Sequence, residues 1–120
     1  MTLKKSFFYF FPPTLWAVFI LVICLIPARE IPSVGLFQAD KIVHIAVYFI
    51  LTWLFYSSFQ KNKINLSPYH FFLLITTIIG YGFFIEIAQE LFTTDRHFDM
   101  WDAVANGLGT VLFIIAKQFV

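Results

Sequence analysis

Residues 68–92 read PYHFFLLITTIIGYGFFIEIAQELF, and this stretch decides the fold class. Within this stretch no charged side chain precedes Glu86. The Ser67-Pro68 pair at its start is a signal for the beginning of a helix. An apolar run of ~20 residues is the length that an α-helix needs to cross the hydrocarbon core of a membrane. The stretch therefore predicts a membrane-spanning helix whose last turns, from Glu86 onward, are polar.

The composition of the whole chain agrees with that prediction. The chain has 120 residues, of which 60% are hydrophobic and 12% charged, and its mean hydropathy is +0.82. A soluble domain of this size needs far more polar surface. About four crossings of ~20 residues each would use the chain, so we expect no separate soluble domain. The net charge of +1, without a basic cluster, argues against nucleic acid as a partner.

The remaining apolar segments predict three more helices. We expect an all-α integral membrane bundle of about four transmembrane helices, organised as a single domain. The helices are predicted at about residues 13–26, 40–59, 68–92 and 99–117. In the last of them Gly107 and Gly109 give a thin face, where a helix of the same chain or of an oligomer can approach closely.

The charged residues are divided unevenly between the two predicted sides of the membrane. The side that holds both termini carries five lysines, which are Lys4, Lys5, Lys61, Lys63 and Lys117. The other side carries three bases and all seven acidic residues. Because basic segments are retained in the cytoplasm, we expect both termini to be cytoplasmic. The protein would then lie in the inner cell membrane with its acidic side facing the cell exterior or periplasm.

Three polar stripes begin at the acidic side, one on each of the last three predicted helices. Residues three or four positions apart share one face of an α-helix. The stripes are Asp40, His44 and Tyr48, then Glu86, Gln89 and Glu90, then Asp99, Asp102 and Asn106. A carboxylate directed into lipid costs several kcal/mol, so the stripes are expected to face one another. They predict a shallow polar pocket at the outer membrane surface.

Each of these side chains also has a purely structural interpretation. His44 can transfer protons or bind a ligand, or it can join two helices by a hydrogen bond. Asp99 and Asp102 can cap the start of the last helix. Arg96 can anchor a helix at the interface, although its guanidinium also suits phosphate or carboxylate. One histidine among carboxylates could hold a divalent cation, but no H-x-x-x-H or C-x-x-C pattern supports a metal, so the cofactor stays open.

At these residues the chain resembles the VanZ-like membrane family. The matching motifs are Asp40-Lys41-x-x-His44-x-x-x-Tyr48, Glu86-x-x-Gln89 and Arg96-x-x-Asp99-x-x-Asp102-x-x-x-Asn106-Gly107, with Gly109. Their order and spacing agree with the family pattern, and they span most of the chain except the first helix. The turn before Arg96 departs from the pattern, because it lacks the proline that such proteins often carry there. The resemblance implies a small four- or five-helix protein of bacterial envelopes, in a family named for resistance to glycopeptide antibiotics, especially teicoplanin.

The leading hypothesis is an envelope protein whose outer-leaflet pocket binds or modifies a lipid-linked or amphiphilic molecule. In the enzymatic version His44 is the general acid/base, Asp40 orients it, and Glu86 and Asp102 form a second acid/base pair or ligate a metal. The predicted binding residues are Lys41, Tyr48, Gln89, Arg96, Asp99 and Asn106. The alternative is a non-catalytic binding or assembly factor whose stripes fix helix register. An ion-coupled carrier fits less well, because the inner half offers no acidic residue for a relay.

Overall fold

The structure, a computed structural model, describes residues 8–25, 37–92 and 100–118, and for residues 37–40 only the helical backbone. Every regular element within these ranges is a helix, which confirms the all-α prediction. The helices are α2 (Phe11–Leu25), α3 (Phe37–Lys61), α4 (Pro68–Phe92) and α5 (Met100–Lys117). Their ends lie within three residues of the predicted ones.

Three of these helices are long and apolar enough to cross a membrane. The apolar spans are Lys41–Lys61, Pro68–Phe92 and Met100–Lys117. Large apolar side chains cover the outward faces, as Phe72 and Phe84 do on α4, and such a surface suits contact with lipid. Helix α2 has 15 residues, so at 1.5 Å per residue it extends about 22 Å, less than the ~30 Å of a hydrocarbon core. A complete crossing by α2 therefore stays a prediction.

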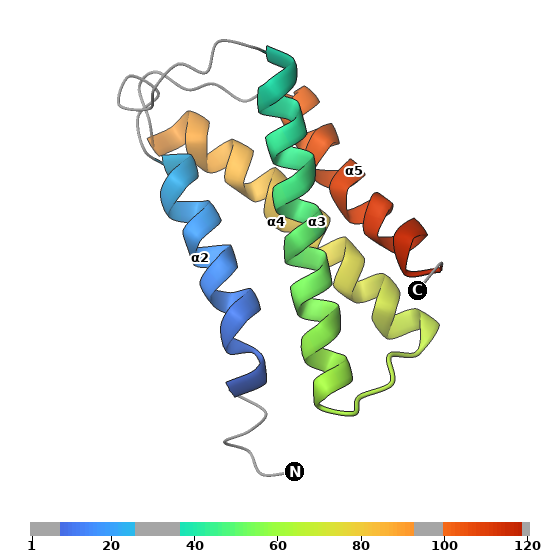
Figure 1. Cartoon of the computed structure of the whole chain (residues 1–120). Helices are drawn as coiled ribbons and strands as arrows, with labels where there is room; N and C mark the ends of the chain where they lie inside the picture. Colours follow the sequence, from blue (N-terminus) through green and yellow to red (C-terminus); the bar gives the residue numbers. More distant parts are fainter. Residues whose placement is uncertain (1–7, 26–36, 93–99, 119–120) are drawn as a thin grey trace.

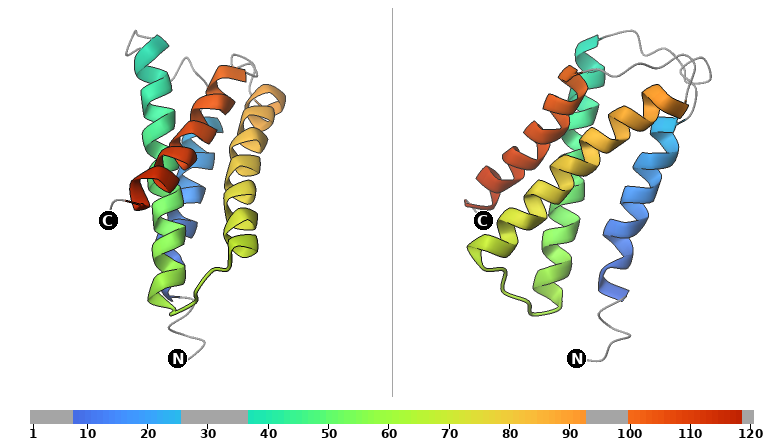
Figure 2. Two further views of the ribbon diagram at one scale, coloured as in Figure 1. Left: turned by 90° about the vertical axis from the view of Figure 1, so that its right-hand side faces the viewer. Right: turned by 180° about the vertical axis from the view of Figure 1, so that it is seen from behind.

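The helices alternate in direction, so that four helix ends meet at one end of the molecule. Helices α3 and α5 begin at the end where α2 and α4 finish (Figure 1). Helices α3 and α5 therefore run in the same direction, and α5 leans across α3 (Figure 2). This topology is the one on which the predicted convergence of the three polar stripes depends.

The crossing of α3 and α5 is built around one glycine. A Cβ atom on Gly109 would collide with the carbonyl group of Ile45 and would lie 3.0 Å from the amide nitrogen of Phe49. A Cβ atom on Gly107 would meet nothing within 4 Å. The predicted thin face is therefore used at Gly109, where the two backbones approach each other, and it is not used within this chain at Gly107.

Helix α2 completes the bundle by packing on α3 and α4. The buried core includes Ile20 of α2, Leu51 of α3 and Ile85 of α4. Two side chains also bond the helix backbones together. The Trp16 indole N–H donates to the Val47 carbonyl at 3.1 Å, and the Tyr81 hydroxyl donates to the Ala17 carbonyl at 2.5 Å. Such contacts satisfy polar groups that would otherwise face hydrocarbon.

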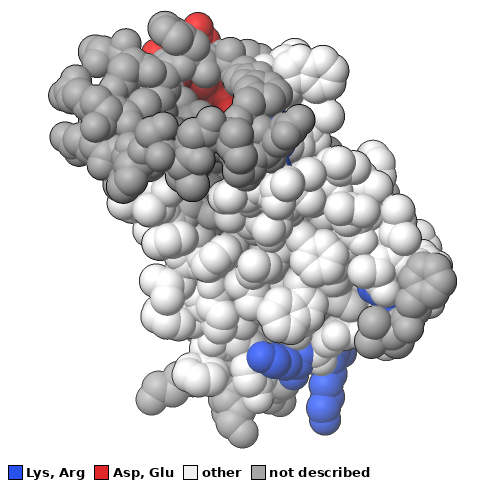
Figure 3. Space-filling view, turned by 45° about the horizontal axis from the view of Figure 1, so that its top comes forward, with Lys and Arg blue, Asp and Glu red and all other residues white. Residues whose placement is uncertain are grey.

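The charged side chains of the described residues gather toward opposite ends of the bundle. Lys61 and Lys117 stand at the last turns of α3 and α5. Glu86 and Asp102 stand near the end of α4 and the start of α5, with Lys41 beside them. Figure 3 shows blue lysine side chains at one end and red acidic atoms at the other. The predicted charge asymmetry is therefore present, and which side of the membrane each end faces stays a prediction.

A methyl group added at Gly109 should force α3 and α5 apart. The backbone of Ile45 cannot move aside as a flexible side chain can, so we expect Gly109→Ala to reduce the free energy of unfolding by about 1–3 kcal/mol. The matched control is Gly107→Ala, for which open space predicts little change. Thermal midpoints of the purified proteins in detergent measure both effects. Equal midpoints for the two variants would contradict the close helix crossing.

Candidate functional site

Helices α3 and α5 bring four predicted site residues together next to their crossing, on the side of the two helix N-termini. The Lys41 ammonium group donates to Oδ1 of Asp102 and forms an ion pair with it. Nδ1 of His44 lies 2.7 Å from Oδ1 of Asn106, and Nε2 of His44 lies 3.8 Å from Oδ2 of Asp102. Lys41 and His44 share a face of α3, as Asp102 and Asn106 share a face of α5, because they are three or four residues apart.

The contacts of His44 define how its ring can act. With the amide oxygen of Asn106 as acceptor, Nδ1 carries the proton and donates it to Asn106. In the neutral ring Nε2 then presents its lone pair toward Asp102. A ring fixed in this way can accept a proton or bind a cation at Nε2.

Helix α4 contributes Glu86 to the same cluster. The side chain of Glu86 is fully buried, whereas His44 and Asp102 are partly exposed. Donor atoms of these three residues all lie within 4.8 Å of one another. Three helices thus bring together the predicted acid–base residues His44, Glu86 and Asp102, which we call the polar cluster. A buried carboxylate is costly and needs compensating interactions, which makes Glu86 the least ordinary member of the cluster.

Gly82 of α4 makes room for the residues below the polar cluster. A Cβ atom there would lie 3.1 Å from Cβ of Asn106, 3.2 Å from its Nδ2 and 3.3 Å from Cε1 of Tyr48. Tyr48 and Asn106 are each only 1% exposed. The Tyr48 hydroxyl and the Asn106 Nδ2 group have no hydrogen-bond partner among the described residues. Two buried donors therefore lie beside the polar cluster.

One further predicted site residue lies within the described part of the chain, and its hydrogen bond reaches α2. Gln89 turns toward α2, where its Nε2 donates to the Cys24 carbonyl at 2.9 Å. The side chain of Asp40 and all of Arg96 and Asp99 lie outside the described residues. Asp40 was predicted to orient His44, and among the described residues the group that orients this ring is Asn106.

The sequence analysis missed one polar contact that continues the same stripes. Thr52 donates to Thr110 through their hydroxyl groups at 3.1 Å, and both side chains are fully buried. Thr52 is four residues beyond Tyr48, and Thr110 is four residues beyond Asn106. Extending the two stripes by one helical turn would have identified this pair.

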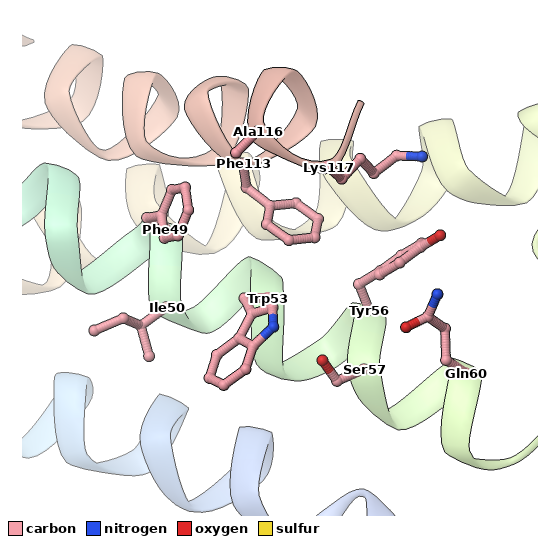
Figure 4. Close-up of a pocket in the computed structure, with 9 residues that line it drawn as sticks. All are labelled: Phe49, Ile50, Trp53, Tyr56, Ser57, Gln60, Phe113, Ala116 and Lys117. Atoms are coloured by element: carbon pink, nitrogen blue, oxygen red, sulfur yellow. The ribbon is translucent and has the colours of Figure 1, made fainter. Parts of the chain in front are cut away.

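A groove of about 580 Å³ lies away from the polar cluster, between the C-terminal halves of α3 and α5 (Figure 4). Its lining residues are Phe49, Ile50, Trp53, Tyr56, Ser57, Gln60, Phe113, Ala116 and Lys117. The Lys117 ammonium group lies 5.2 Å from the centre of the Tyr56 ring. None of the predicted site residues lines this groove. Apolar recesses are ordinary on a lipid-facing surface, so the candidate site is the polar cluster.

Comparisons with known proteins do not assign a family. No family model matches the chain. A segment of 76 residues, or 63% of this chain, is 36% identical to an uncharacterized protein of Schizosaccharomyces pombe. The match covers 44% of that relative, so this chain spans less than half of its length. No solved structure matches. The relative is eukaryotic, and its description names no activity, so the resemblance to the VanZ-like family stays a prediction.

The ion pair between Lys41 and Asp102 should contribute to stability. Lys41→Met keeps an apolar stem and leaves Asp102 without the ammonium group, so we expect the free energy of unfolding to fall by about 1–3 kcal/mol. The matched control is Lys61→Met, at the exposed last turn of α3.

The same measurement includes a compensating substitution. Adding Asp102→Leu to Lys41→Met should restore part of the lost stability, because it removes the carboxylate left behind. Thermal midpoints in detergent compare the variants. The ion pair has no such role if Lys41→Met melts at the same temperature as Lys61→Met.

Proposed function

We propose that this chain is a VanZ-like membrane protein of the cell envelope, and that its polar cluster binds or modifies the head group of a lipid-linked or amphiphilic molecule. The observation that carries the proposal is the convergence of His44, Glu86 and Asp102 from three different helices. Charged and titratable groups gathered inside an otherwise apolar bundle mark functional sites more often than structural ones.

The place of the polar cluster suits a ligand that is itself anchored in lipid. His44 stands three residues after Lys41, where the apolar span of α3 begins, so at 1.5 Å per residue it lies only ~5 Å inside the span. The side chains of Lys41, His44 and Asp102 keep 14–15% of their surface exposed. A head group held at the membrane surface can therefore reach the cluster while its tail remains among the acyl chains.

The hydrogen-bond donors near the polar cluster support a head group that offers acceptor atoms. The Tyr48 hydroxyl and the Asn106 Nδ2 group are buried donors without a described partner. Lys41 adds a cationic donor, although it is already paired with Asp102. Such donors bind oxygen acceptors of the kind found in phosphates, carbonyl groups and sugars. We therefore propose a ligand with an oxygen-rich head group.

In the enzymatic version of the proposal, His44 acts as the general acid/base. Its Nδ1–H group is fixed by Asn106, which leaves Nε2 to take a proton from the ligand or from water. The carboxylate of Asp102 lies 3.8 Å from Nε2 and would stabilise the imidazolium that forms. The buried carboxylate of Glu86 is the second acid/base candidate in the same cluster.

Charge distribution supports the proposed orientation in the inner membrane. Lys61, Lys63 and Lys117 share the end opposite to the polar cluster, and Lys4 and Lys5 precede α2 in the sequence. A preference of basic segments for the cytoplasm would put both termini inside and the polar cluster at the outer surface. The cluster would then meet head groups of the outer leaflet.

Binding of a polyprenyl phosphate tests the proposal directly. This probe has an apolar tail and an oxygen-rich anionic head, and the matching polyprenol has a similar tail without the phosphate. Native mass spectrometry of the purified protein should show retention of the phosphate over the alcohol by the wild type. We expect the preference to fall at least ~10-fold in His44→Ala, the loss of about 1.4 kcal/mol. Exposed His70 supplies the matched control, His70→Ala.

Two outcomes would overturn the proposed function. One is equal retention of phosphate and alcohol by the wild type. The other is unchanged preference in both His44→Ala and Glu86→Gln. The finer proposal of glycopeptide resistance is tested by expressing the chain in a teicoplanin-sensitive bacterium. A rise in the inhibitory concentration that disappears in His44→Ala supports it, and an unchanged concentration rejects it.

A second candidate function is a non-catalytic assembly factor, and a specific observation favours it. The Lys41–Asp102 and His44–Asn106 contacts join α3 directly to α5, so the same side chains can serve to fix helix register. This candidate predicts that His44→Ala lowers the thermal midpoint in proportion to lost function. Lost ligand binding at an unchanged midpoint favours the ligand site instead.

A further inference from the structure

We propose that the polar cluster is a binding site for a divalent transition-metal cation. The ligands are Nε2 of His44 and one carboxylate oxygen each from Glu86 and Asp102. This inference rests on the proposed function, because it assigns a cofactor class to the same site. It can nevertheless be tested separately, since metal binding is measured without any ligand for the head-group site.

The distances between the donor atoms are close to those around a single cation. Zinc–nitrogen and zinc–oxygen bonds are about 2.0–2.2 Å long, so two ligands of one tetrahedral ion lie ~3.4 Å apart. Nε2 of His44 and Oδ2 of Asp102 are 3.8 Å apart. With Glu86 included, one donor atom from each of the three residues lies within 4.8 Å of the others. Small side-chain rotations would bring all three to bonding distance of one ion.

The orientation of His44 is the one that metal-binding histidines require. Such histidines almost always donate their second ring N–H to a carbonyl or carboxylate, which fixes the tautomer. Nδ1 of His44 makes this contact with the Asn106 side chain at 2.7 Å. Nε2, the nitrogen that faces the carboxylate of Asp102, is therefore the metal ligand.

The charges of the polar cluster also favour a divalent cation. Within the cluster, Glu86 and Asp102 supply two negative charges as carboxylates. Lys41, which is paired with Asp102, adds one positive charge beside it. Burial raises the free-energy cost of a negative charge, and Glu86 is the most buried of the three proposed ligands. A bound divalent cation reverses the sign and leaves one net positive charge. That charge would attract an anionic oxygen of hydroxide or of a head group.

Buried hydrogen-bond donors beside the polar cluster provide an independent indication of a ligand. Asn106 is 99% buried, and its Nδ2 group has no hydrogen-bond partner among the described residues. The other amide atom, Oδ1, is hydrogen-bonded to His44. The Tyr48 hydroxyl is buried to the same degree. As N–H and O–H donors, they can donate to an oxygen atom that is bound to the cation. The site therefore has groups for the metal and for a metal-bound oxygen.

The donor set selects among metals. Imidazole nitrogen suits zinc, iron, nickel and copper, whereas calcium and magnesium prefer oxygen ligands throughout. One histidine with two carboxylates is thus suited to Zn²⁺, with Mn²⁺ and Fe²⁺ as competitors. Zinc has no redox chemistry to complicate a measurement, so it is the probe of choice.

Metal content of the purified full chain tests this inference. The protein in detergent is stripped with a chelator, dialysed against Zn²⁺ and analysed by elemental mass spectrometry. We expect one zinc per chain in the wild type and in His70→Ala, and its loss in His44→Ala. Asn106→Ala should weaken zinc affinity about 10–100-fold in competition with a chromophoric chelator. Bound zinc should also raise the thermal midpoint of the wild type.

The outcomes separate the metal site from the proposed function. Absence of stoichiometric zinc and of a spectral change with Co²⁺ in the folded wild type overturns the inference. Retention of zinc by His44→Ala and by Glu86→Gln overturns it as well. Where His44→Ala does not fold, the wild-type measurements with Zn²⁺ and Co²⁺ decide. Zinc binding that depends on His44, without preference for the polyprenyl phosphate, keeps the metal site and rejects the proposed function. Preference for the polyprenyl phosphate without zinc binding keeps the proposed function and rejects the metal site.

Discussion

The close approach of α3 and α5 at Gly109 is the constraint on which the rest of the structure depends. Because a glycine faces the Ile45 carbonyl, the two backbones lie near enough for short side chains to meet across the crossing. His44 reaches Asn106 on one side of this contact, and Thr52 reaches Thr110 on the other. Gly82 does for α4 what Gly109 does for α5, since it admits Tyr48 and Asn106 to the interface. Small residues therefore position the polar groups without contributing any chemistry themselves.

Hydropathy and helix signals were enough to predict the all-helical fold and the ends of the helices. The convergence of His44, Glu86 and Asp102 was also predictable, because alternating helix direction and a spacing of three or four residues place them on facing stripes. The pairing of side chains was not predictable. It depends on the rotation of each helix about its axis, which is set by packing at Gly82 and Gly109. For the same reason the sequence does not predict that Nε2 of Gln89 donates to the Cys24 carbonyl of α2.

The contacts that join the helices also orient the side chains of the polar cluster. Asn106 joins α5 to α3 and, through the same hydrogen bond, fixes the tautomer of His44. Asp102 pairs with Lys41 through one oxygen and presents the other toward His44. Burial of the Glu86 carboxylate is costly. The proposed cation would offset that cost.

Cross-linking between cysteines in the native membrane tests the central claim that three helices direct their polar faces into one cluster. In a Cys24→Ser background, His44→Cys is combined in turn with Glu86→Cys, with Asp102→Cys, and with Ile115→Cys on the exposed face of α5. A short thiol-specific cross-linker should join the first two pairs within one chain, as intact mass would show, and should leave the third pair unlinked. Failure of both cluster pairs, together with linkage of the third, would contradict the account.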